Sequence, residues 1–215
     1  MYDTVKEGVA MDYIKELLKE KYIQELLESN NLDGVYSYCL TEERGKLTQF
    51  LLNNEIEPLD YVSQIYPSMY ACTDITGIFV PENIKDIGNN AFAACMELEQ
   101  VQLPLGLNYI ENSMFISCTF LETVNIPSTV QGVGTRAFKE CASLKEIILP
   151  EGLQCIEKAA FAFCLDLNKI YIPDSCVDID ETAFLKCKYL EIHCNKNSYA
   201  HEYAVKNNIK FKLVN

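Results

Sequence analysis

The chain has 215 residues, of which 49% are hydrophobic, and a formal net charge of −13. This composition excludes a disordered chain and is ordinary for a packed globular protein. The acidic balance repels phosphate groups, so we expect no binding to nucleic acid.

No stretch of the sequence is predicted to target the protein to a membrane or to anchor it there. The first residues include acids and lack the apolar run of a secretion signal. A run of about 18 apolar residues, which a membrane-spanning helix needs, is not present. We therefore expect a cytoplasmic protein without membrane contact, or a cell-surface or secreted one if a leader has been removed.

Residues 1–70 are predicted to form a helical N-terminal region. Apolar doublets recur there at helical spacing, and "NNLDG", residues 30–34, is predicted to stop a helix. Thr41 is the predicted N-cap of a second helix, and Pro58 begins a short third one. We interpret the region as a helical cap, with a separate binding module as the alternative. The helices are expected over residues 13–27, 41–54 and 58–66.

Residues 71–194 are predicted to form a repeat array with a period of 23 residues. Each proline of the array is followed at fixed distances by a phenylalanine, a cysteine and a leucine. A period between roughly 20 and 29 residues is typical of a leucine-rich solenoid. The four columns are Pro81, Pro104, Pro127, Pro150 and Pro173; Phe92, Phe115, Phe138, Phe161 and Phe184; Cys95, Cys118, Cys141, Cys164 and Cys187; and Leu98, Leu121, Leu144, Leu167 and Leu190.

One turn of the array, "LKEIIL" at residues 144–149, predicts a short strand. Ile147 and Leu149 face the interior and Ile148 faces outward, because side chains alternate along a strand. Pro150 ends the strand, since it has no N–H for a further hydrogen bond. A single turn cannot bury its phenylalanine, so each turn must stack on its neighbours.

The repeat reads I-x-I-P-x-x-V-x-x-I-G-x-x-A-F-x-x-C-x-x-L, most clearly in "VNIPSTVQGVGTRAFKECASL", residues 124–144. Over about residues 75–211 the chain resembles the BspA-type (treponemal) leucine-rich repeat family. The resemblance implies an α+β solenoid, a right-handed leucine-rich repeat stack of short parallel strands with an N-terminal helical cap or domain. The family is known for adhesion and protein binding, and it has no catalytic residues to transfer.

Residues 195–215 are predicted to form a C-terminal cap. Ser198 is the expected N-cap of a short helix over residues 199–207, and Asn207 or Asn208 is the expected left-handed stop. An alternating strand follows, with one apolar face made of Ile209, Phe211 and Leu213.

The cysteine column is predicted to be structural and reduced. Free cysteine packs as a small buried hydrophobe, and Cys176 is expected to join the same core. The sequence contains no C-x-x-C motif and no close histidine pair, so we expect no bound metal.

We expect no enzymatic activity and no cofactor. The only histidines, His193 and His201, are both expected in the C-terminal cap, away from any nucleophile of the array. No glycine-rich phosphate loop is present, and Asp178 and Asp180 are expected on a turn without an apolar pocket. An enzyme with its site in residues 1–70 is the least favoured alternative.

The outward side chains of the strands offer a candidate binding surface. Most of these side chains are polar, as expected of a solvated sheet face. The repeat period places Glu191 at the same position of its turn as Lys145 and Asn168. Ordinary strand propensity and a protein-binding patch explain the apolar exceptions equally well. The candidates are Phe79, Ile148 and Tyr171, rimmed by Lys145, Glu146, Lys169 and Glu122.

The leading hypothesis is therefore a non-enzymatic protein–protein interaction module that binds a protein partner through the strand face. The alternative is an acidic decoy that occupies a nucleic-acid-binding site of a partner protein. Carboxylates clustered on one face would favour the decoy, and scattered carboxylates would remove its basis.

Overall fold

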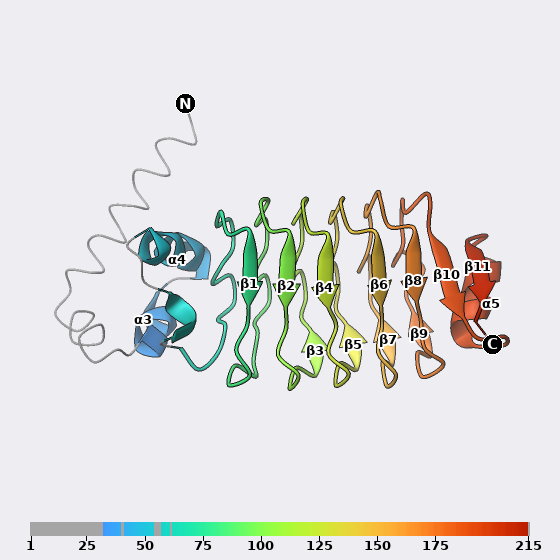
Figure 1. Ribbon diagram of the computed structural model, residues 1–215, viewed down its shortest axis with the longest axis horizontal. Helices are drawn as coiled ribbons and strands as arrows, with labels where there is room; N and C mark the ends of the chain where they lie inside the picture. Colours follow the sequence, from blue (N-terminus) through green and yellow to red (C-terminus); the bar gives the residue numbers. More distant parts are fainter. Residues whose placement is uncertain (1–31, 40, 54–56, 61, 215) are drawn as a thin grey trace, which may run out of the picture.

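The computed structural model describes residues 32–39, 41–53, 57–60 and 62–214. Within them the chain forms an elongated solenoid, in which short parallel strands lie side by side along the long axis and helices lie at both ends (Figure 1). The predicted α+β solenoid of short parallel strands is confirmed. The helix expected over residues 13–27 lies outside the described residues.

Two sheets line one side of the described solenoid, β1-β2-β4 and β6-β8-β10-β11, and a narrower sheet, β3-β5-β7-β9, runs alongside them (Figure 1). Neighbouring strands pair in parallel one period apart, so that Gly77 pairs with Gln100 and Gln100 with Thr123. The strands of the first two sheets are β1 Gly77–Phe79, β2 Gln100–Gln102, β4 Thr123–Asn125, β6 Glu146–Ile148, β8 Lys169–Tyr171, β10 Glu191–Cys194 and β11 Lys210–Leu213. Those of the narrower sheet are β3 Tyr109–Ile110, β5 Gly132–Val133, β7 Cys155–Ile156 and β9 Asp178–Ile179.

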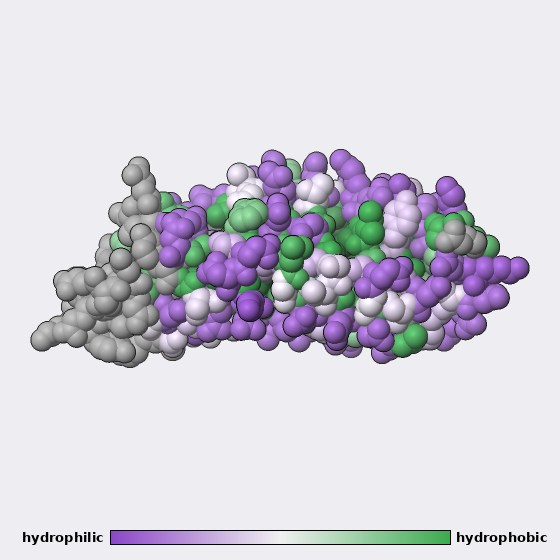
Figure 2. Space-filling view, turned by 60° about the horizontal axis from the view of Figure 1, so that its bottom comes forward, coloured by the Kyte–Doolittle hydropathy of each residue, from purple (hydrophilic) through white to green (hydrophobic). Residues whose placement is uncertain are grey.

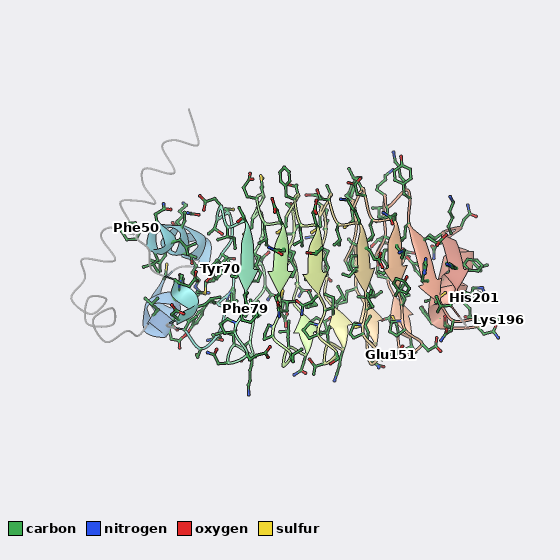
Figure 3. All side chains as sticks on the ribbon, in the orientation of Figure 1. Phe50, Tyr70, Phe79, Glu151, Lys196 and His201 are labelled. Carbon is green, nitrogen blue, oxygen red and sulfur yellow. The ribbon has the colours of Figure 1, made fainter. Side chains whose placement is uncertain are left out.

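The phenylalanine column forms a continuous stack through the interior. Successive rings lie 5.2–5.5 Å apart between centroids and are nearly parallel. Tyr70 extends the stack at its first end, next to the helices (Figure 3), and Tyr203 closes the other end edge-on to Phe184. Each turn therefore buries its ring against the rings of both neighbours, as the repeat predicts.

The cysteine column adds hydrogen bonds that the sequence did not reveal. Each thiol donates to a backbone carbonyl of the previous turn, over 2.9–3.1 Å. The acceptor is the aromatic residue of the stack, so that Cys141 bonds to the carbonyl of Phe115. All ten cysteines are free, and Cys176 is buried as expected. The column therefore connects the turns as well as filling space.

The solenoid pattern begins upstream of residue 71. Ile65 forms a parallel bridge with Ile87, and Thr73 stands where later turns have cysteine, with its hydroxyl bonded to the carbonyl of Tyr70. The short helix predicted over residues 58–66 is therefore wrong beyond the single turn η2, Pro58–Asp60. Pairing with the next turn outweighs the local helical signal there.

The helices α3, Leu32–Tyr38, and α4, Arg44–Leu52, pack at the first end of the solenoid. The stop predicted at residues 30–34 is wrong in part, because α3 includes its last three residues. Leu32 and Tyr36 lie one helical turn apart and are both buried. Their packing favours a helix more strongly than the polar residues of the stretch 30–34 oppose it.

Thr41 is not the N-cap of the second helix. It begins a tight turn, η1 Thr41–Glu43, and Glu43 occupies the cap position of α4 without a side-chain cap bond. The start of α4 is fixed instead by packing, since a Cβ at Gly45 would lie 2.0 Å from the carbonyl oxygen of Ala71. Thr48 adds a hydrogen bond from α4 to the carbonyl of Met69.

The helix start, the left-handed stop and the strand predicted for the C-terminal segment are present. The N-cap of α5, Tyr199–Lys206, is Ser198, whose hydroxyl accepts from the N–H of His201 over 3.2 Å. Asn208 takes the left-handed conformation that ends the helix. Strand β11 then pairs in parallel with β10 and leaves its own outer edge unpaired within the described chain.

Candidate protein-binding face

The outward side chains of β1, β2, β4, β6, β8 and β10 form what we call the strand face. The residues two positions before each proline form one column of this face, in which Phe79 lies beside Gln102 and Ile148 beside Tyr171. Although β4 and β6 are neighbours, they belong to different sheets of the described chain (Figure 1). The strand face is thus divided into an N-terminal half, on β1, β2 and β4, and a C-terminal half, on β6, β8 and β10.

This division separates the predicted apolar candidates. Phe79 is 59% exposed at the end of β1, in the N-terminal half (Figure 3). Ile148, 63% exposed, and Tyr171, half-buried, are adjacent in the C-terminal half. The structure therefore brings together two of the three predicted anchors.

His193 joins this pair. It lies on β10, beside Tyr171 in register, and not in the terminal cap where the sequence placed it. The two ring centroids are 4.6 Å apart, and Nε2 of His193 lies 2.7 Å from Oε1 of Glu191. Lys169 pairs with Glu191, so the repeat is 22 residues long at this point. Glu191 therefore lies beside Lys169, and the expectation from the sequence that it lies in one column with Lys145 is wrong.

Charged side chains rim the pair of anchors. Nζ of Lys169 lies 2.9 Å from Oε2 of Glu146 and 5.8 Å from the ring centroid of Tyr171. The hydrogen bond to Glu146 raises the pKa of Lys169 above its ordinary value. Lys145, the residue before β6, reaches across to Glu122, with 3.7 Å between Nζ and Oε1. All four predicted rim residues therefore form ion pairs, and Lys169 also positions the tyrosine ring.

The N-terminal half carries a feature that the sequence did not predict, a concave surface of about 790 Å³ over β1, β2 and β4. Its outward residues have uncharged polar side chains apart from Gly77, Phe79 and the rim residue Glu99. Asn125 is fixed in place, because its side chain bonds the N–H of Leu103 over 2.7 Å and the carbonyl of Leu103 over 3.3 Å.

Elsewhere the surface is mixed. The side that carries the narrower sheet has hydrophilic and hydrophobic residues interspersed (Figure 2). Among the described residues, no three His, Cys, Asp or Glu side chains gather as they would around a metal ion. In the same part of the chain, no helix is both long and apolar enough to span a bilayer.

Comparison with known proteins identifies the repeat. The family model of the BspA type leucine rich repeat region matches residues 63–191, in six copies. The chain belongs to the BspA-type leucine-rich repeat family. The family resemblance seen in the sequence is thereby confirmed, and a search of curated proteins found no match.

Solved structures of leucine-rich repeat proteins are similar to this BspA-type chain. The T. pallidum leucine-rich repeat protein is 27% identical, with a TM-score of 0.54 over 55% of this chain and 58% of that one. A leucine-rich repeat protein from Bacteroides ovatus is 23% identical, with a TM-score of 0.53 over 74% and 48% of the two chains. The pneumococcal vaccine antigen PcpA is 17% identical, with a TM-score of 0.54 over 71% and 44%. The last two show the fold alone, and this chain spans just over half of the treponemal protein.

Proposed function

We propose that this BspA-type protein is a non-enzymatic module that binds a protein partner through the C-terminal half of the strand face. The observation that carries the proposal is an exposed Ile148 beside a positioned Tyr171, surrounded by ion-paired side chains. Protein interfaces combine an apolar or aromatic centre with a polar rim, and a few central residues contribute most of the binding energy.

The position of Tyr171 supports its role as an anchor. The ring is already held between His193 and Lys169, so it loses little conformational freedom when a partner binds. The exposed pairs Lys145–Glu122 and Lys169–Glu146 contribute little to folding stability. Their proposed role is to select a partner with complementary charges, which affects specificity and association rate.

The test begins with capture of the partner from the native cell, followed by calorimetry with the purified pair. The double variant Tyr171→Ala with Ile148→Ser is expected to weaken binding by about 2 kcal/mol or more, as for hot-spot residues. A matched control is Tyr189→Ala with Val177→Ser, which removes similar side chains that are 71% and 60% exposed outside the strand face. Equal affinity of both double variants, with unchanged melting, would place the binding site elsewhere.

The charge pattern of the strand face does not favour the acidic decoy. Glu146, Lys169, Glu191 and Lys210 occupy successive positions of one column of the strand face and its continuation on β11. Charge therefore alternates there, whereas a mimic of nucleic acid needs an extended surface of one sign.

For the part of residues 1–70 that precedes the first turn of the solenoid we propose the role of a cap, supported by the packing of Gly45 and Thr48 against that turn. Fractionation of the native cell would test the cytoplasmic location expected from the sequence against a cell-surface one.

A further inference from the structure

The concave surface over β1, β2 and β4, which we call the amide hollow, is chemically unlike the rest of the strand face. Register places its outward residues on a small grid, with Gly77, Gln100 and Thr123 in one row. Phe79, Gln102 and Asn125 form the next row. Every member of the grid is exposed and none is charged.

The two glutamines are available for a ligand. Gln100 and Gln102 lie two residues apart on β2, so their side chains leave the same face of the strand. Neither side chain hydrogen-bonds to another residue of the described chain, whereas Asn125 is held by the backbone of Leu103. Gly77 makes room for one of them, since a Cβ there would lie 3.3 Å from Cγ of Gln100.

The chemistry of the lining restricts the ligand. A glutamine amide offers two donors and an acceptor, which matches hydroxyl groups that both donate and accept. The centre of the grid carries no charge to compensate a charged ligand, and Phe79 supplies an exposed aromatic face at one edge. The hollow, at about 790 Å³, lies within the roughly 300–1,000 Å³ range of small-molecule sites.

We infer that the amide hollow binds a neutral oligosaccharide. Gln100 and Gln102 hydrogen-bond the sugar hydroxyls, and Phe79 packs against the C–H face of a ring. Asn125 and Thr123 form the wall on the far side, and the carboxylate of Glu99 accepts hydrogen bonds from hydroxyl groups at the rim. The spacing of neighbouring strands, about 4.8 Å, is comparable with the width of one pyranose ring.

A protein partner fits this surface less well. The centre of a protein interface is apolar, and burying the two glutamine amides there without matched partners would cost free energy. The inference does not rest on the proposed protein-binding function, because the anchors Ile148 and Tyr171 lie on the other half of the strand face.

The experiment is calorimetric titration of the full chain with maltohexaose, cellohexaose, mannohexaose and N-acetylchitohexaose, and with a galacturonic acid hexamer as the charged probe. At least one neutral probe is expected to bind. The double variant Gln100→Ala with Gln102→Ala is expected to weaken that binding about tenfold or more, which is about 1.4 kcal/mol. Phe79→Ala, at a side chain that is 59% exposed, tests the same site with little effect on folding.

The matched control is the double variant Tyr171→Ala with Ile148→Ser, which alters the other half of the strand face and should leave sugar binding unchanged. Melting curves of all variants confirm that they fold. Failure of every neutral probe to bind at millimolar concentration overturns the inference. So does equal binding of the charged hexamer, or binding that survives both the glutamine and the Phe79 substitutions. Loss of a captured protein partner in the glutamine variant, without any sugar binding, makes the hollow a protein site instead.

Discussion

Replacing Phe138 with alanine tests whether the ring stack holds the solenoid together. Phe138 is fully buried, and its ring centroid lies 5.2 Å from those of both Phe115 and Phe161. The substitution removes a buried aromatic side chain and leaves a cavity in the middle of the stack. Such losses cost about 3–5 kcal/mol, and we expect the upper half of that range because contacts on both faces of the ring are lost.

The assay is urea denaturation followed by circular dichroism, with thermal melting alongside. For a chain of this length each kcal/mol shifts Tm by about 2–4 °C, so a loss of about 4–5 kcal/mol lowers Tm by roughly 8–20 °C. The matched control is Phe120→Ala, at a side chain that is 54% exposed, which should change the free energy of unfolding by no more than about 0.5 kcal/mol. Equal losses in the two variants would refute the argument, because burial and stacking alone distinguish these phenylalanines.

Three further predictions follow from the cysteines and the C-terminal segment. Without denaturant, a thiol reagent should label the exposed Cys72 quickly and leave Cys95, Cys118, Cys141 and Cys164, the four buried members of the column, unmodified; rapid labelling of these four would contradict their structural role. Burial raises the pKa of the Cys95 and Cys187 thiols from the ordinary value of 9.0 to about 11. The free energy of unfolding should therefore fall as the pH rises from 9.0 to about 11. The thiols of the unfolded chain lose their protons at a lower pH than those of the folded chain, so alkali favours the unfolded state. Urea titrations at increasing pH measure the free energy of unfolding, and a value that does not change with pH would disprove the prediction. Deleting residues 195–215 should cause aggregation or loss of cooperative unfolding, and a soluble monomer with unchanged melting would show that the segment is no cap.

The sequence predicted the parts of the fold that repeat. Proline, phenylalanine, cysteine and leucine return at one period, so the inward direction of Phe138 and the outward direction of Ile148 could be assigned before any coordinates. It failed where a local signal competes with packing between turns. Ile65 lies in a segment whose sequence predicts a helix, but it pairs with the next turn of the solenoid. Thr41 has the side chain of an N-cap, but it is the first residue of η1.

The candidate site was predictable only in part. The pairing of Lys169 with Glu146 follows from the period, whereas the contact of His193 with Tyr171 depends on one turn that is a residue shorter. That shift becomes visible only through the backbone register. The amide hollow has no sequence signal either, because it is formed by residues of three separate strands and by the absent side chain of Gly77.

The thiol–carbonyl bonds and the ring stack make the interior of one turn nearly identical to that of the next. A duplicated segment of one period would therefore find the same neighbours wherever it entered the middle of the array. The outward positions have no such constraint, since Gln102, Asn125 and Ile148 occupy one column with unlike chemistry. Mutation can thus diversify the surface of one turn while the shared interior stays constant, so new recognition properties can evolve turn by turn without loss of the scaffold.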